Sequence, residues 1–508
     1  MKLFSLRLTT LKSKLYAIVF ASFVVRVVAF FALPNSASNL APDEGNYGGL
    51  TEWIAQGNPA DEYPYISLYI RSRSLIVPAT LLNRIGFSGL ESVRIIASLY
   101  GLLTIIIAVY FLLKLFNSKK EVSNYVLTNQ KKILTFFSIF TFLPSNLGWS
   151  ILGLRESATG FWLLVVFGLV FYVFQLKKSQ SRIAILGIIV AVPLVFSSRP
   201  QVGWVLGITL LIYFLVRVSN KAAKVLIPST LIGIFLGYAA TTAFSIETTD
   251  TFTARAELVN TSSPSSQVKI SPPIKTTSKK PSKSEQATSS PTATSSPTAT
   301  SEAEFDASLM CKSEGQEVSI GDLKYICGNR IEKKSVVGLR NPGLVIVDQA
   351  DAIPLRNEIN KIGAASVIET QACPNAGTSR FDKYFCIAYR APYTTYTFLF
   401  RPMVGADVTS TSSLFAAAEN IFWLVSILFV LIMLIRNRRL AFFSALAPSL
   451  LFMSIYSVAA GAYEGNMGTA FRHKSLILWV VILLLASTIV ATQQRKAEQQ
   501  GFSGPSQE

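Results

Sequence analysis

Apolar residues in this chain gather in long uninterrupted blocks that are separated by short polar segments. A helix needs about 20 apolar residues to cross a bilayer, and these blocks come close to that length. The sequence therefore predicts an all-α polytopic membrane protein with about ten transmembrane helices. The predicted spans are 15–33, 93–113, 133–151, 157–176, 183–197, 203–216, 225–244, 417–435, 440–460 and 474–491.

The basic residues between these spans orient the chain. The formal net charge is +18, and lysines and arginines such as Lys119, Lys131 and Arg438 fill alternate connections. Cytoplasmic connections carry this excess in membrane proteins, so we place both termini in the cytoplasm, including the tail 493–508. The first span lacks a small-residue cleavage site, which indicates a retained helix and not a signal peptide. The excess charge reflects topology, and nucleic acid is not an expected partner.

Two large segments then lie outside the membrane. The first, 34–92, is a loop of a transmembrane core that we assign to 1–244, and the second, 245–413, precedes the C-terminal helices of 414–492. Residues 245–304 are rich in Ser, Thr and Pro and include the tandem SSPTATSSPTAT. A segment with so few apolar side chains cannot offset the entropy of ordering, so this linker is expected to be disordered and open to glycosylation.

Residues 305–413 are expected to fold as a small extracytoplasmic α/β domain. Short β-type runs occur at 343–348, 365–369 and 393–400, around the helical pattern LRNEINKIG. Such a domain could select a substrate or act as a rigid lid, and the sequence leaves both roles open.

All four cysteines lie in this predicted domain. On the oxidising side of the membrane they predict two structural disulfides, and the absence of a CxxC motif argues against zinc. Proximity in the sequence favours Cys311 with Cys327 and Cys373 with Cys386, among three pairings that remain open.

Several basic residues lie on the side that topology does not explain. Arginine is costly near a membrane face unless it is paired, and its planar guanidinium suits phosphate. Each of these residues could instead reach the interface by itself or pair with a neighbouring glutamate. Because three separate outside turns each carry an arginine, we expect these arginines to bind an anionic headgroup together. The turn residues are Arg155, Arg199, Arg472 and His473, with Glu156 and Glu464 as neighbours, and the first outside loop adds Arg71, Arg73, Arg84 and Arg94.

Two adjacent carboxylates, Asp43 and Glu44, follow the first span in the stretch PDEGNY. A carboxylate can take a proton from an acceptor hydroxyl while arginines stabilise a departing phosphate, which is the chemistry of glycosyl transfer from a lipid phosphate. Residues 46–56 also predict an interfacial amphipathic helix, whose start Asp43 could cap. Both roles can coexist.

These residues resemble the membrane-embedded GT-C glycosyltransferases, which include protein O-mannosyltransferases and aminoarabinose transferases. Over roughly the first 220 residues, the matching pieces are Arg26, PDEGNY, an amphipathic segment ending at Gly57, the span 93–116 and the connection LPSNLGWSILGLRES. The resemblance implies a polyprenyl-phosphate sugar donor, an extracytoplasmic glycan, lipid or protein acceptor, and Asp43 or Glu44 as general base for an inverting transfer.

The chain also departs from that family. Arg155 and Glu156 stand where many relatives carry Asp, and Arg199 and Pro200 stand where a Lys is common. The C-terminal stretches LFRPMVGADVTSTSSLFAAAENIFWL and YEGNMGTAFRHKSLILW are similar to membrane proteins of bacterial surface-polysaccharide clusters. This second resemblance implies a bacterial plasma membrane protein.

The predicted site draws on both ends of the chain. We expect Asp43 and Glu44 to be catalytic. The donor phosphate would bind Arg155, Arg199, Arg472 and His473, and the substrates would also contact Tyr47, Glu156, Gln201, Glu464 and Asn466. No cofactor is firmly predicted, although two adjacent carboxylates allow a divalent ion at Asp43 and Glu44.

Two other functions fit the same features. A polymerase or ligase acting on a lipid-linked oligosaccharide would use outward arginines equally well, but the early carboxylate pair counts against it. A non-catalytic flippase would be expected to show internal repeats, and no convincing repeat is present. A Walker loop and a dinucleotide fingerprint are also absent, and the single His makes a Ser-His-Asp triad improbable.

Overall fold

The computed structural model describes residues 2–33, 42–60, 63, 69, 71–116, 126–175, 181–217, 221–242, 317–320, 323–326, 380–403, 407–408, 411–436, 447–464 and 468–477. The chain divides into two compact units, Met1–Glu247 with Val336–Glu508 and, separately, Thr248–Ser335. In the second unit, strands β1 (Glu317–Ile320) and β2 (Leu323–Ile326) pair in an antiparallel hairpin, with Glu317 opposite Ile326.

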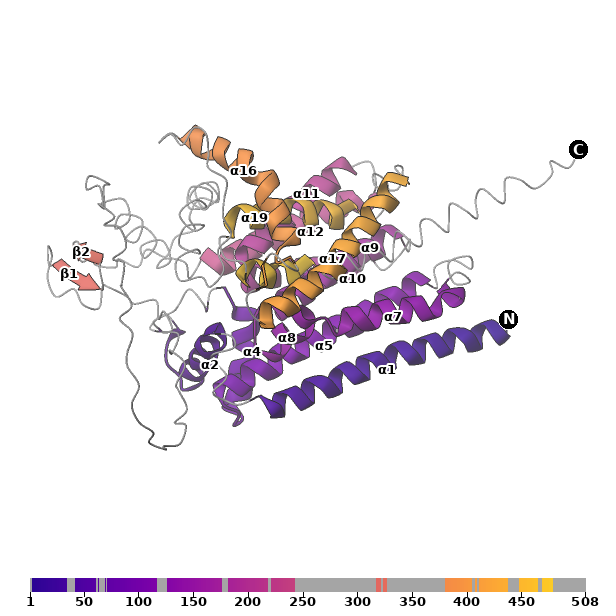
Figure 1. Ribbon diagram of the computed structural model, residues 1–508, viewed down its shortest axis with the longest axis horizontal. Helices are drawn as coiled ribbons and strands as arrows, with labels where there is room; N and C mark the ends of the chain where they lie inside the picture. The colour runs from indigo at the N-terminus through magenta and orange to yellow at the C-terminus, as the bar shows by residue number, and fades with distance from the viewer. Residues whose placement is uncertain are drawn as a thin grey trace, which may run out of the picture. The chain divides into compact units, whose positions relative to one another are not determined.

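The first unit is helical wherever it is described with regular structure. Its N-terminal part contains α1 (Lys2–Ala32), α2 (Pro42–Ala55), α4 (Arg73–Arg84), α5 (Gly89–Phe116), α7 (Gln130–Thr141), α8 (Pro144–Ile151), α9 (Glu156–Gln175), α10 (Ser181–Ser198), α11 (Pro200–Val216) and α12 (Lys221–Thr242). Its C-terminal part contains α16 (Arg380–Phe400), α17 (Thr411–Arg436), α19 (Ala447–Tyr463) and the helical residues 468–477. Helix α1 packs along α5 and α7 (Figure 1).

Several of these helices are long and apolar enough to cross a membrane. Among the described residues, five helices meet that description, and three shorter apolar helices accompany them. The prediction of a helical membrane protein is confirmed at this level, whereas the ten predicted spans are not. The five are Leu11–Ala32, Gly89–Lys114, Glu156–Val173, Ala223–Thr241 and Ser413–Ile432, and the shorter ones are Ala184–Ser198, Pro200–Val216 and Ala447–Ala462.

The predicted span 133–151 is interrupted by a proline. Helix α7 ends at Thr141, and α8 begins at Pro144 after Leu143, which adopts an extended backbone with φ −55° and ψ 137°. A residue before proline is pushed away from helical angles, and proline itself suits the first turn of a new helix. The block is therefore two short helices and not one continuous helix.

The predicted α/β domain is corrected at its C-terminal end. Residues 393–400 form the last two turns of α16 and not a strand, because this helix continues from Arg380 and packs against α19. The runs 343–348 and 365–369 lie outside the described residues. Cys386 lies on α16, while Cys311, Cys327 and Cys373 fall outside the described part of the chain, so the disulfide pairing stays a prediction.

A small apolar cluster holds α2 in place. Tyr47 and Leu50 of α2 are fully buried against Leu75 and Ile76 of α4 and Val93 of α5. The predicted helix 46–56 is confirmed, but it begins earlier, at Pro42. Asp43 therefore lies inside the first turn and does not occupy the capping position, although a carboxylate there still complements the helix dipole.

The larger apolar core includes buried side chains along α9, α10 and α11. Helix α10 packs against α9, α11 and α12, and α11 also packs against α19. Buried side chains such as Phe196, Phe214 and Phe452 fill this core. The connections between these helices carry the basic turn residues, so the packing decides where those residues meet.

Candidate functional site

The adjacent carboxylates of α2 point to different partners. Neighbouring helical residues project about 100° apart, so Asp43 and Glu44 leave the helix in different directions. Glu44 is fully buried and accepts hydrogen bonds from Arg94 of α5, at 2.5 Å from Nε and 3.1 Å from Nη2. The Asp43 side chain is 40% exposed and accepts a bond from Arg472 Nη1 at 2.5 Å. Only Asp43 is therefore open to solvent.

Arg155 follows a tight turn between α8 and α9. Gly153 in this turn has φ +67°, a left-handed conformation that favours glycine. A Cβ at this position would lie 3.0 Å from Val93 Cγ1 and 3.3 Å from Glu44 Oε1, so the turn also packs closely on α5 and α2. Arg155 Nη1 donates to the Arg71 carbonyl at 3.3 Å. Within the described part of the chain, Arg155 forms no ion pair with a carboxylate.

Glu156, the first residue of α9, joins two of the arginines. Its Oε1 atom pairs with Arg472 Nε at 2.7 Å and also with Arg199 Nη2. Arg199 lies in an extended conformation between α10 and α11, because Pro200 starts the next helix. Since Arg472 also pairs with Asp43, a continuous chain of ion pairs runs from Asp43 through Arg472 and Glu156 to Arg199.

The single histidine extends this row of ion pairs. His473 contacts Glu464 through Nδ1 and Arg199 through Nε2. Glu464 follows α19 and is 1% exposed, and His473 is 8% exposed. The structure therefore brings together residues that are separated by more than 400 positions in the sequence, from Asp43 to His473.

Several buried polar atoms around this row of ion pairs have no hydrogen-bond partner among the described residues. The donors include the guanidinium nitrogens Arg155 Nε, Arg199 Nε and Arg472 Nη2 and the Tyr47 hydroxyl. The acceptors Glu156 Oε2 and Glu464 Oε2 are in the same situation. Buried donors without partners are costly, so an anion that accepts from them would be stabilised here.

The surrounding charges keep Asp43 and Arg472 ionised. Burial alone would raise the pKa of Asp43, but the charge and hydrogen bond of Arg472 and the charge of Arg155 hold that pKa below its ordinary value. Burial would lower the pKa of Arg472, yet the charges of Glu156 and Asp43 raise it well above the usual range. In Glu44 burial outweighs the bonds from Arg94, so its pKa is raised.

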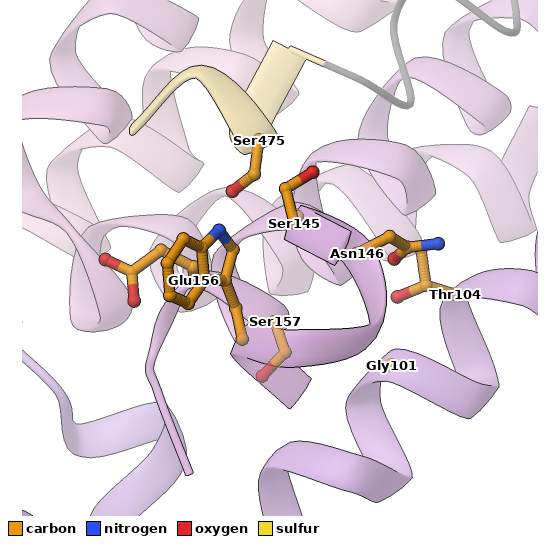
Figure 2. Close-up of a pocket in the computed structure, with 9 residues that line it drawn as sticks. Gly101, Thr104, Ser145, Asn146, Glu156, Ser157 and Ser475 are labelled. Atoms are coloured by element: carbon orange, nitrogen blue, oxygen red, sulfur yellow. The ribbon is translucent and has the colours of Figure 1, made fainter. Parts of the chain in front are cut away.

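A small recess adjoins Glu156. Its wall comes from α5, α8, α9 and the helical residues 468–477, and most of its side chains are small and polar. In the close-up, Glu156 lies on the left and Asn146 and Thr104 on the right (Figure 2). The lining residues are Gly101, Thr104, Ser145, Asn146, Trp149, Glu156, Ser157, Gly160 and Ser475.

The predicted site residues do not all meet. Arg155, Arg199, Arg472 and His473 converge with Asp43 and Glu156, as their placement in outside turns led us to expect. Glu44 turns away to Arg94, and Gln201 lies half-buried in the first turn of α11. Asn466 lies outside the described residues.

The other basic residues of the predicted first outside loop have different surroundings. Arg73 donates to the Ala240 carbonyl and stacks over Tyr69, and Arg84 is an exposed residue in the last turn of α4. Arg71 provides the carbonyl that binds Arg155. Arg73 and Arg71 therefore link neighbouring segments of the chain, whereas Arg84 faces outward.

A second buried polar group was not predicted from the sequence. Glu419 of α17 accepts from the Ser145 backbone nitrogen at 2.8 Å and from Trp423 Nε1 at 3.1 Å. Lys474 Nζ donates to Asn420 Oδ1 at 2.6 Å. An acid and an amide within the apolar block 417–435 were the available signal, since polar groups inside a span are rarely incidental.

The carboxylate pair does not fit a shared metal site. Glu44 uses both of its oxygens for Arg94, while Asp43 faces Arg472. Among the described residues, no group of three or more His, Cys, Asp or Glu side chains could hold a metal ion. We derive no metal-dependent step from these residues.

No protein-family model, curated protein or solved structure matches this chain. The resemblance to GT-C glycosyltransferases therefore stays a prediction from the sequence, and the chemistry of the site has to be argued from its own residues.

Proposed function

We propose that this chain transfers a sugar from a polyprenyl-phosphate donor to an acceptor hydroxyl outside the membrane. The observation that supports the proposal most is the convergence of Asp43 with three arginines from separate connections between apolar helices. A half-exposed carboxylate beside clustered guanidinium groups provides both a proton acceptor and an anion site.

Arg155 is proposed as the main anchor for the donor phosphate. Arg199 and Arg472 are already paired with Glu156, whereas Arg155 donates to the backbone carbonyl of Arg71. A half-buried guanidinium that pairs with no carboxylate among the described residues gains more from an incoming phosphate than one that must first give up an ion pair. The Tyr47 hydroxyl has no hydrogen-bond partner among the described residues and interacts electrostatically with both Arg155 and Arg472, so it would supply a further donor.

In the proposed reaction, the bond between the sugar anomeric carbon and the phosphate oxygen breaks, and the acceptor oxygen forms the new bond from the opposite face. The acceptor proton passes to Asp43, and the electron pair of the broken bond leaves with the polyprenyl phosphate. A phosphate that accepts bonds from Arg472 competes with Asp43 for that arginine. Donor binding would then loosen the Asp43–Arg472 pair and make Asp43 a stronger base.

The different environments of the two carboxylates support Asp43 over Glu44 as the base. Glu44 is fully buried and bound at both oxygens by Arg94, so it has no free oxygen to accept a proton from a substrate. Asp43 keeps 40% of its side chain exposed. Glu44 is therefore proposed to fix α2 against α5 and so to hold Asp43 in position.

The proposal places the protein in a bacterial plasma membrane, with the donor lipid in the outer leaflet. The acceptor would be a cell-surface polysaccharide, glycolipid or protein. A polymerase or ligase would instead consume a lipid-diphosphate oligosaccharide. Purified protein given monophosphate and diphosphate donors in parallel would separate these reactions.

The direct test is Asp43→Asn, which keeps the size of the side chain but removes its basicity. Full-length protein in nanodiscs is expected to lose at least a hundredfold in transfer, since general base catalysis contributes about 10²–10⁴-fold. Glu52→Gln is the matched control, because Glu52 is an exposed carboxylate near the other end of α2 that accepts a bond from the Gly89 nitrogen at 2.8 Å. Retained transfer in folded Asp43→Asn protein would end the assignment.

A further inference from the structure

Both ring nitrogens of His473 are in contact with charged side chains from two different elements. Nδ1 contacts Oε1 of Glu464, which follows α19, and Nε2 contacts Nη1 of Arg199, which lies between α10 and α11. Arg199 in turn pairs with Glu156 through its other terminal nitrogen. His473 is thus the second residue in a row that runs Glu464, His473, Arg199, Glu156.

The direction of each hydrogen bond follows from the chemistry of the partners. A guanidinium group can only donate, so the Nε2 atom that meets Arg199 has to present its lone pair. The ring proton then lies on Nδ1 and is donated to the Glu464 carboxylate. His473 is therefore neutral and in one tautomer, which Glu464 selects.

From this geometry we infer that His473 is a positioning residue, which acts in its neutral form by holding Arg199 in the orientation that pairs with Glu156. The inference rests on the proposed function only in that the positioned arginine belongs to the phosphate site. It replaces the expectation that His473 itself binds phosphate, because both of its nitrogens already have partners.

Protonation of His473 would reverse this arrangement. An imidazolium would present an N–H toward Arg199 and add a positive charge near Arg472 and Lys474 of its own helix. The groups that face the ring from other elements are Arg199, Glu464 and Glu156, and Tyr456 donates to the His473 carbonyl at 3.3 Å. Burial and the charge of Arg199 outweigh Glu464, so the pKa of His473 lies below its ordinary value of 6.5.

The tautomer can be observed directly, because His473 is the only histidine of the chain. Full-length protein carrying ¹⁵N-labelled histidine, purified with a tag that contains no histidine, gives one pair of ring nitrogen signals. At pH 7.5 we expect a protonated Nδ1 and an unprotonated Nε2. An imidazolium, or a neutral ring with the proton on Nε2, would overturn the inference whatever the enzyme does.

A second measurement asks whether the contact matters for the site, with farnesyl phosphate as the probe. In His473→Gln the side chain does not titrate, but its amide oxygen can still accept a hydrogen bond from Arg199. His473→Ala removes this acceptor. We expect His473→Gln to bind the probe within about twofold of the original protein at pH 7.5, and His473→Ala to bind about tenfold more weakly.

The pH dependence completes the test. Because the phosphate titrates near pH 6, affinities are compared at each pH as the ratio of the original protein to His473→Gln. This ratio is expected to fall about tenfold as His473 becomes protonated, and a constant ratio would contradict the positioning role. If the original protein does not bind the probe at any pH, the proposed function fails, while the nitrogen spectrum still decides the tautomer.

Discussion

Neutralising the two adjacent carboxylates of α2 should reduce stability by very different amounts. Glu44→Gln removes the carboxylate from a buried ion pair, because Glu44 and Arg94 are 0% and 1% exposed and bond through two pairs of atoms. Breaking a buried pair by removing one partner costs about 3–5 kcal/mol of stability. Asp43→Asn removes a half-exposed partner from Arg472, which retains Glu156, so the cost should stay below about 1 kcal/mol.

The assay is the free energy of unfolding of the full-length protein in mixed micelles, measured for both variants beside Glu52→Gln as the control. A double variant, Glu44→Met with Arg94→Met, should recover most of the stability lost in Glu44→Gln, because an apolar pair of similar volume leaves no buried charge. Equal destabilisation by Glu44→Gln and Asp43→Asn would refute this reasoning. So would a double variant that is less stable than Glu44→Gln.

Two further predictions concern stability. Gly101→Ala should cost about 1–3 kcal/mol, because its Cβ would lie 2.5 Å from Ser150 Cβ, whereas Gly148→Ala meets nothing within 4 Å and should be neutral or stabilising. Thermal unfolding of both alanine variants tests this, and equal midpoints would contradict it. Asp407 gives the second prediction. Hydrogen bonds from Arg401 lower the pKa of Asp407 by more than burial raises it, so this pKa lies below its ordinary value of 3.8. The stabilisation is therefore present above that value and is lost as pH falls through the lower pKa of the folded state. Asp407→Asn should lower the unfolding midpoint at pH 7, and its effect should shrink as the solution becomes more acidic. A difference in midpoint that does not change with pH would show that the carboxylate charge is not responsible.

The meeting of the turn arginines could be predicted from the sequence because the predicted topology places their connections on the same side. Arg155, Arg199 and Arg472 stand at places where the positive-inside rule gives no reason for a basic residue. If alternate connections emerge on one side of a membrane, residues in those connections share a surface, and their identity as arginines suggests a shared anion. This argument needs the order of the spans and does not need their packing.

The different partners of Asp43 and Glu44 could not be predicted in the same way. Whether a carboxylate points outward or into the protein depends on the rotation of α2 about its axis, which the apolar contacts of Tyr47 and Leu50 decide. The partner of Glu44 lies on α5, 50 positions away, and nothing in the local pattern identifies Arg94 among four nearby arginines.

The errors in secondary structure have a common origin in packing. The run 393–400 is rich in Tyr, Thr and Phe, which favour strands, yet the helix that begins at Arg380 continues through it, with Phe398 fully buried. In the block 133–151 hydropathy outweighed Pro144, which starts a new helix whose first turn is bound by Glu419. Local composition was a weaker guide in both places than the contacts made by the folded chain.

The most direct test of the central claim is a cryo-electron microscopy structure of the full-length protein in nanodiscs with farnesyl phosphate. We predict density for the phosphate within hydrogen-bond distance of Arg155 and Arg472, with Asp43 facing the same space. A phosphate bound elsewhere, or arginine side chains that point separately into lipid or solvent, would contradict the account.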